Sequence, residues 1–245
     1  LAGGDGTLRR MVRGLLAARG AKGDEPKDPW EALPPIGLLP FGTVNCVARD
    51  IGLPRRAGPL LARVVESLRL GRVRPYDLAF IEAGHGPEEP FLLSTGFGLE
   101  GAAILATSPE AKRRFGAAAF IAAGFALDLA RLPILRLEGD GIALEGTQVT
   151  VVNSATYGGS FRPFRGDSAD GLLDLLVHTS QNLFDLGLLC ARAGLGGLAG
   201  LRLASCAVRA IDSAPYHLDG DEAGILQAGE VARIRLAPRL LRFLA

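Results

Sequence analysis

Gly3-Gly4-Asp5-Gly6-Thr7 is the stretch that decides the fold of this 245-residue chain, because it joins a glycine-rich turn directly to a helical pattern. Apolar residues recur after it with the spacing of one α-helical face, and they are Leu8, Met11, Val12, Leu15 and Leu16. Gly20 can end this helix. A turn of this kind presents backbone N–H groups at a helix N-terminus, where an anion is stabilised. The stretch therefore predicts a phosphate-binding turn.

Asp5 is an acid inside this anion site, which is unfavourable unless a cation joins it. We predict that Asp5 shares a Mg²⁺ ion with nucleotide oxygens, because Mg²⁺ binds carboxylates and phosphates. A plain glycine turn in which Asp5 or Thr7 caps the helix stays open as the alternative. Only Leu1 and Ala2 precede the turn, whereas a phosphate-binding turn normally follows a β-strand. We therefore expect the first domain to be N-terminally incomplete.

The composition indicates substantial apolar cores, since 48% of the residues are hydrophobic. The formal net charge is +1. A charge this small leaves no basic footprint for nucleic acid. The apolar segment 117–127 is too short to span a bilayer. Three cysteines without paired spacing, Cys46, Cys190 and Cys206, fit a reducing cytoplasmic compartment. The histidines are isolated along the chain and show no triad or metal pattern, and they are His85, His178 and His217.

A second strand–turn–helix unit follows within residues 35–49, with Gly42 in its turn. In an α/β domain two such turns converge on one edge of the sheet, where ligands bind. Gly42, Thr43 and Asn45 are therefore candidate nucleotide contacts. We expect Thr43 to cap the helix that follows, and simple capping by Thr43 and Asn45 stays open as their only role. Another amphipathic helix is expected over residues 60–70.

β-strand patterns dominate from Tyr76 onward, so we expect a domain boundary there. Residues 1–75 are predicted to form an α/β domain and residues 76–237 a β-rich domain, with residues 238–245 returning to the first. The expected strands lie at 75–81, 91–95, 132–137, 149–153, 172–177, 206–211 and 231–236. Helical patterns interrupt them at about 109–131 and 183–189.

Two stretches of the second part crowd acids around a glycine. Asp167, Asp170 and Asp174 surround one tight turn, which either holds a cation or carries solvated turn acids. In Asp219-Gly220-Asp221 the glycine lets both acids point into one site, as a base and its metal or water partner need. The glycine-rich stretch 94–101 is a turn after a strand when taken by itself.

In this order the stretches resemble the diacylglycerol kinase-like lipid kinases, the superfamily that includes sphingosine and ceramide kinases. The matching residues are Gly3-Gly4-Asp5-Gly6-Thr7, Leu39-Pro40 with Gly42, Thr43, Asn45, Ala48 and Arg49, Asp77-Leu78, Gly96-Phe97-Gly98, Asn153 with Gly158-Gly159, Asp170-Gly171 with Asp174, and Asp219-Gly220-Asp221. They cover nearly the whole chain and are specific in combination. The first stretch alone is shared with NAD kinases and phosphofructokinases.

The resemblance implies an α/β nucleotide-binding domain and a β-sandwich-like second domain, with ATP between them. It implies Mg²⁺-dependent phosphoryl transfer from ATP to the hydroxyl of a lipid such as diacylglycerol. The protein would then be cytoplasmic and peripheral at the inner membrane face, without a transmembrane segment, and a homodimer stays open. Such a transfer relies on positioning and charge neutralisation, which glycine turns, a metal ion and a carboxylate can supply.

The resemblance also assigns roles to individual acids. Asp221 matches the family's general base, and Asp5 would join Asp77 in a carboxylate–water–Mg²⁺ network. A structural cation would be held by the Asp170 side chain and by the carbonyls of Asp167 and Leu172. Asp219, which flanks the same glycine as Asp221, stays open as the rival base.

Two departures from the family pattern bear on these roles. Asp221 stands where the family has Glu, so the carboxylate is one methylene shorter. Cys46 stands where many bacterial relatives have Asp, which removes one acid from the predicted Mg²⁺ network. An NAD kinase-like enzyme and a non-catalytic lipid- or nucleotide-binding relative therefore stay open as alternatives. The chain lacks the Asn-Glu dipeptide that we expect of an NAD kinase.

Overall fold

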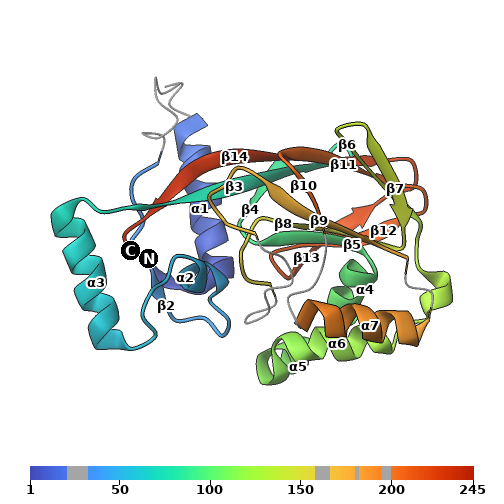
Figure 1. Cartoon of the computed structure of the whole chain (residues 1–245), viewed down its shortest axis with the longest axis horizontal. Helices are drawn as coiled ribbons and strands as arrows, with labels where there is room; N and C mark the ends of the chain where they lie inside the picture. The colour runs from blue at the N-terminus through green and yellow to red at the C-terminus, as the bar shows by residue number, and fades with distance from the viewer. Residues whose placement is uncertain (21–32, 158–165, 180–181, 195–199) are drawn as a thin grey trace.

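The computed structural model describes residues 1–20, 33–157, 166–179, 182–194 and 200–245 (Figure 1). An α/β part lies beside a β-rich part, and a group of helices covers one side of the latter (Figure 1). Within the described ranges, no helix has the length and apolar character needed to cross a bilayer.

The N-terminal part is the α/β unit that the sequence predicts. Its elements are β1 (Ala2–Gly3), α1 (Asp5–Gly20), β2 (Leu39–Pro40), α2 (Cys46–Asp50) and α3 (Ala57–Leu70). β1 and β2 pair in parallel, with Ala2 opposite Leu39, so the turns that follow the two strands lie at the same edge. The predicted apolar face of α1 points inward, since Leu8 and Val12 are fully buried.

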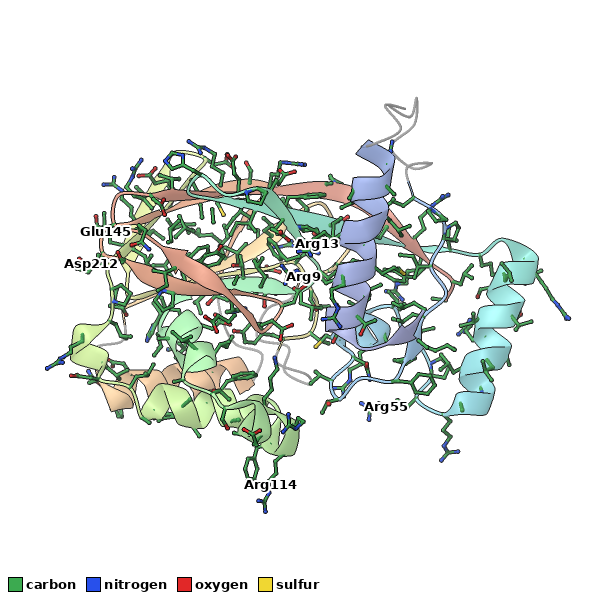
Figure 2. The ribbon with its side chains drawn as sticks, turned by 180° about the vertical axis from the view of Figure 1, so that it is seen from behind. Arg9, Arg13, Arg55, Arg114, Glu145 and Asp212 are labelled. Atoms are coloured by element: carbon green, nitrogen blue, oxygen red, sulfur yellow. The ribbon has the colours of Figure 1, made fainter. Side chains whose placement is uncertain are left out.

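The opposite face of α1 contacts the β-rich part through a hydrogen bond and ion pairs. Figure 2 shows Arg9 and Arg13 on the side of α1 that faces the sheets. Arg9 Nε donates to the Pro90 carbonyl at 2.9 Å, and Arg13 Nη1 lies 3.3 Å from Glu89 Oε2. Arg9 and Arg13 thus dock α1 on the strand that contains Glu89 and Pro90.

The β-rich part contains two six-stranded antiparallel sheets among the described residues. One sheet has the order β10-β9-β8-β5-β12-β13 and the other β4-β3-β14-β11-β6-β7. The strands are β3 (Arg74–Ala83), β4 (Glu88–Phe91), β5 (Ser94–Gly98), β6 (Leu135–Gly139), β7 (Ile142–Gly146), β8 (Gln148–Val152), β9 (Leu173–His178), β10 (Leu201–Leu203), β11 (Ser205–Ala210), β12 (Ala214–Leu218), β13 (Asp221–Leu226) and β14 (Val231–Phe243). Their inward residues form one apolar cluster, so the two sheets pack as a sandwich.

Helices lie beneath the sheet that contains β5 (Figure 1). They are α4 (Leu99–Leu105), α5 (Pro109–Phe115), α6 (Ala117–Phe125) and α7 (Leu183–Gly194), with a short 3₁₀ helix at Leu129–Arg131. The helical stretch expected at 109–131 is therefore divided. Gly116 separates α5 from α6 and has a positive φ of 57°, which a helix interior does not accommodate.

Residues of β3 alternate between two apolar clusters. Tyr76, Leu78 and Phe80 pack with α1, α2 and their neighbours, whereas Ala79 and Ile81 pack between the two sheets. β14 pairs with β3 in antiparallel fashion, and its last residues, Leu241 and Phe243, belong to the first cluster. The return of the chain end to the first part thus occurs by a continuous strand.

The strand expected at 91–95 is interrupted in the structure. β4 ends at Phe91 and β5 begins at Ser94, so Leu92 and Leu93 belong to neither strand. The backbone N–H groups of Leu92 and Leu93 donate instead to the carboxylate of Asp219. The apolar run in the sequence predicts the strand, but it does not reveal the distant acid that divides it.

Candidate active site

The first glycine turn is in direct backbone contact with the second. A Cβ on Gly42 would lie 2.5 Å from the Cα of Gly4 and 2.7 Å from Asn45 Oδ1, and one on Gly4 would lie 3.0 Å from the Cα of Gly42. Phe41 N–H also donates to the Gly3 carbonyl at 3.1 Å. Neither glycine tolerates a side chain without a backbone shift. The predicted convergence of the two turns is therefore observed.

Gly42→Ala should destabilise the protein by about 1–3 kcal/mol, which is the usual range for overpacking. The new methyl group would overlap the Gly4 backbone, so the two turns must separate. Gly14→Ala is the matched control, because Gly14 lies within α1 and has nothing within 4 Å of a Cβ position. Urea unfolding of both variants measures the difference, and equal stability would refute the close-contact argument.

Asp5 links the two turns by capping α2. Its Oδ2 accepts from Cys46 N–H at 2.8 Å, and its Oδ1 accepts from Val47 N–H at 3.2 Å. The expectation that Thr43 caps this helix is wrong, because α2 begins at Cys46 and has no side-chain cap from its own turn. Burial raises the pKa of the Asp5 carboxyl, and the two backbone N–H groups act against that rise.

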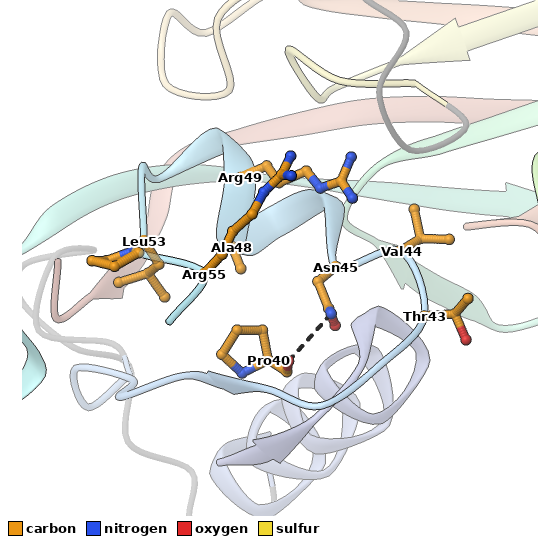
Figure 3. Close-up of a pocket in the computed structure, with 9 residues that line it drawn as sticks. Pro40, Thr43, Val44, Asn45, Ala48, Arg49, Leu53 and Arg55 are labelled. Carbon is orange, nitrogen blue, oxygen red and sulfur yellow. Dashed lines mark hydrogen bonds between the residues drawn. The ribbon is translucent and has the colours of Figure 1, made fainter. Parts of the chain in front are cut away.

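The side chain of Asn45 forms hydrogen bonds within the second turn. Its Oδ1 accepts from Gly42 N–H at 3.0 Å, and its Nδ2 donates to the Pro40 carbonyl at 3.3 Å, the bond drawn in Figure 3. Its φ of 53° is left-handed, a conformation that Asn tolerates better than most residues. The side chain thus stabilises the turn that contacts Gly4.

A pocket of about 160 Å³ adjoins this turn (Figure 3). Its lining is partly apolar and includes two arginines, and the lining residues are Pro40, Thr43, Val44, Asn45, Ala48, Arg49, Leu53, Pro54 and Arg55. The guanidinium groups give the pocket positive charge. Two of the predicted nucleotide contacts, Thr43 and Asn45, therefore line one cavity.

Asp221 faces the first glycine turn from the β-rich part. Its Oδ2 lies 3.4 Å from where a Cβ on Gly6 would be. Its Oδ1 lies 2.5 Å from Lys112 Nζ, which also donates to the Gly220 carbonyl at 2.8 Å. About half of the Asp221 side chain is exposed, so the carboxylate is open to a ligand. The fold thus brings together Gly6 and Asp221, which are far apart in sequence.

Asp219 points away from this site into the protein. Its carboxylate accepts backbone N–H bonds from Leu92 at 3.0 Å, Leu93 at 2.7 Å and Ser94 at 3.2 Å. Asp219 and Gly220 have φ values of 55° and 80°, which is the pattern of a two-residue type I′ hairpin turn between β12 and β13. Asp219 therefore holds the turn in place while Asp221 leaves it toward Gly6.

Asp77 is fully buried on β3 and is bound by backbone groups. Its Oδ2 accepts from Gly171 N–H at 2.7 Å and its Oδ1 from Arg239 N–H at 2.6 Å. Burial raises the pKa of the Asp77 carboxyl, and the nearby Asp170 carboxylate adds to that rise. Asp77 thus anchors the acid-rich turn of Gly171 to β3 and β14, and among the described residues no hydrogen bond joins it to Asp5.

The acid-rich turn is organised by its own backbone and by an arginine. Asp167 Oδ1 accepts from Ala169 N–H at 3.1 Å, and Asp170 Oδ1 accepts from Leu172 N–H at 3.0 Å. Arg202 forms ion pairs with both Asp170 and Asp174. Within the ranges given above, no three acid, histidine or cysteine side chains gather as a metal site. The predicted Gly158-Gly159 match lies outside the described residues.

A buried polar network that the sequence did not single out connects α2 to the β-rich part. Asp50 Oδ2 accepts from Ser154 Oγ at 2.6 Å and from Tyr76 OH at 3.2 Å, and Asp50 Oδ1 accepts from Thr156 Oγ1 at 2.8 Å. Burial raises the pKa of the Tyr76 hydroxyl, and the nearby carboxylates of Asp50, Asp219 and Asp5 add to that rise. The helix that Asp5 caps is therefore fixed at its other end as well.

Comparison with known proteins bears on these motifs. A family model described as "Diacylglycerol kinase catalytic domain" matches residues 1–81. The chain is 28% identical over 193 residues to "Diacylglycerol kinase" of Bacillus subtilis (strain 168). This match covers 74% of this chain and 55% of that protein. It is 30% identical over 182 residues to "Probable lipid kinase YegS-like" of Xanthomonas euvesicatoria pv. vesicatoria (strain 85-10), with coverage of 72% and 54%. The chain thus spans about half the length of the curated relatives that it matches.

The whole fold also has a solved counterpart. A diacylglycerol kinase from Bacillus anthracis str. Sterne superposes with a TM-score of 0.70 and 18% identity, covering 99% of this chain and 75% of that chain. At this identity the likeness concerns the fold. Ordered motifs along the chain, the match of residues 1–81 to the catalytic-domain model and the shared two-part architecture agree, and the chain is similar to the diacylglycerol kinase-like family.

Proposed function

We propose that the protein that carries this chain transfers the γ-phosphoryl group of ATP to the hydroxyl of a lipid such as diacylglycerol. One observation carries the proposal: a carboxylate of the β-rich part, Asp221, lies against Gly6 of the phosphate-binding turn. A base and a phosphate-binding turn that face each other are what such a transfer requires. The names of the relatives support the same class of reaction.

Different residues of this chain would bind the phosphates, accept the proton and support the turn. Backbone N–H groups at the start of α1 would bind phosphate oxygens, and the contact with Gly42 fixes the shape of their turn. Asp221 would accept the proton of the lipid hydroxyl as that oxygen attacks. Lys112, which lies against Asp221, keeps a positive charge beside the reacting phosphate. Asp219 acts as a structural anchor in this scheme, not as the base.

Asp5 and Asp77 fit a Mg²⁺ ion in ligand type, because carboxylate oxygens have lone pairs beyond the one that each N–H bond uses. Asp5 and Asp77 are the residues that would hold it, and a bound Mg²⁺ would neutralise charge on the phosphates. The structural cation at Asp167, Asp170 and Leu172 also stays a proposal. Arg202 already supplies positive charge to Asp170.

A lipid substrate brings the protein to a membrane surface, so we propose peripheral association with the inner face and no nucleic-acid partner. Incubating the full protein with labelled ATP, Mg²⁺ and mixed micelles of different lipids should yield a labelled lipid that chelation by EDTA abolishes. Labelled NADP in a parallel reaction with NAD would indicate the NAD kinase-like alternative. ATP binding without any transfer would indicate the non-catalytic one.

A further inference from the structure

His217 uses both ring nitrogens although it is isolated in the sequence. It lies on β12 and is 1% exposed. Its Nε2 lies 2.8 Å from Glu100 Oε1, and its Nδ1 accepts from Gly220 N–H at 3.2 Å. Gly220 is the residue between the two acids of the active-site turn. His217 therefore connects Glu100 on α4 to the backbone of that turn.

The donor at Gly220 decides the form of the imidazole. A backbone N–H can only donate, so Nδ1 must be the unprotonated nitrogen. The ring proton then sits on Nε2 and points at the Glu100 carboxylate. Glu100 is itself fixed, because Thr150 Oγ1 donates to its Oε2 at 2.7 Å and Tyr157 OH donates to its Oε1. The pair is thus a neutral histidine oriented by a carboxylate.

Glycines next to the pair leave room for it. A Cβ on Gly96 would overlap Glu100 Oε2 and lie 2.7 Å from His217 Nε2. A Cβ on Gly101 would overlap the Pro215 carbonyl, so this glycine lets α4 pack directly on β12. Gly96 in β5 and Gly101 in α4 therefore leave space for the Glu100 side chain at the buried face of the sheet.

The turn that presents Asp221 is held at both of its central residues. The Asp219 carboxylate binds three backbone N–H groups on one side. Gly220 N–H is bound by His217 on the other side. Asp221, the next residue, begins β13 opposite Leu218, and its half-exposed side chain contacts Lys112. The direction of its side chain toward Gly6 thus depends on the preceding two residues and on Lys112, which also binds the Gly220 carbonyl.

Resting on the proposed function, we infer that Glu100 and His217 are positioning residues for the reaction. Neither touches the site at which the hydroxyl attacks. Their task is to fix Gly220, and through it the angle at which Asp221 meets the hydroxyl proton. Errors of about 1 Å in such a geometry can lower a rate about 100-fold.

Two substitutions at one position separate the two contacts of His217. The amide of Gln reaches the place of Nε2, so His217→Gln keeps a group beside Glu100 and loses the acceptor for Gly220. The oxygen of Asn can take the place of Nδ1, so His217→Asn keeps that acceptor. We expect His217→Gln to lower kcat about 10- to 100-fold with KM for ATP unchanged, and His217→Asn to retain most of kcat.

His85→Gln is the control for the substitution itself, because His85 is exposed after β3. Thermal melts identify a temperature at which every variant is folded, and the assays are run there. Equal kcat values for wild type and His217→Gln, or equal losses in the Gln and Asn variants, would overturn the inference. Absence of lipid phosphorylation by the wild type would instead refute the proposed function.

A spectroscopic readout tests the pair without any turnover. In protein with ¹⁵N-labelled histidine, the signals that disappear in His217→Asn belong to His217. We expect them to report a neutral ring with the proton on Nε2 at pH 7. A proton on Nδ1 is incompatible with the Gly220 contact and would contradict the inference, whatever the enzyme activity is.

Discussion

Asp221→Asn is expected to lower kcat by about 10²–10⁴-fold while leaving the KM for ATP nearly unchanged. An amide is isosteric with the carboxylate but cannot take the proton of the attacking hydroxyl. The half-exposed side chain faces Gly6 and Lys112, so the substitution breaks no buried contact. The free energy of unfolding should therefore stay close to that of the wild type, which separates a chemical effect from loss of fold.

Two further variants make this prediction sharp. Asp221→Glu should keep activity, because it restores the residue of the family's D-G-E motif. Glu222→Gln is the neighbouring control, since Glu222 is exposed on β13 and lies opposite His217 in the strand register. Steady-state rates with saturating ATP measure all three. Normal turnover by Asp221→Asn would move the role of base to another carboxylate.

Asp219→Ala should destabilise the protein by about 3–5 kcal/mol, the range seen when one partner of a buried charged interaction is removed. Three backbone N–H groups would lose their acceptor, and a buried unsatisfied donor carries its full desolvation cost. Burial raises the pKa of the Asp219 carboxyl, while these same N–H groups act against that rise. Chemical denaturation followed by circular dichroism measures the loss.

Asp221→Ala is the matched control, because it removes the other acid of the same turn. It should cost well under 1 kcal/mol, as is usual for a half-exposed side chain with one surface ion pair. Together the two alanine variants assign stability to Asp219 and chemistry to Asp221. Similar losses of stability in both variants would contradict the conclusion that the Asp219 side chain is a buried anchor and the Asp221 side chain is not.

The local patterns of the sequence predicted most of the fold. The i, i+3, i+4 spacing after Thr7 predicted α1 with its buried face, and the strand expected at 231–236 forms the first part of β14. The ordered glycine and acid motifs predicted a resemblance to the diacylglycerol kinase-like family, which the comparisons confirm. These features depend on residues that are close together in the sequence or on short motifs, so a single sequence is enough to identify them.

The contacts within the site could not be predicted in the same way. Asp5 reaches Cys46 across 41 residues, and Lys112 reaches Asp221 across 109. No periodicity links positions so far apart, and the function of an acid depends on which N–H groups or cations surround it. Asp219 and Asp221 are alike in sequence, and only burial separates their roles. His217 was isolated along the chain because its partner, Glu100, lies on another element.

The shared strands β3 and β14 have a thermodynamic consequence. Each runs through both apolar clusters, so neither cluster can lose its packing while these strands stay paired for the other. Melting is then a single cooperative event rather than two successive ones. Two paired strands, rather than a single linker, therefore join the part that contains the nucleotide turn to the part that contains the base.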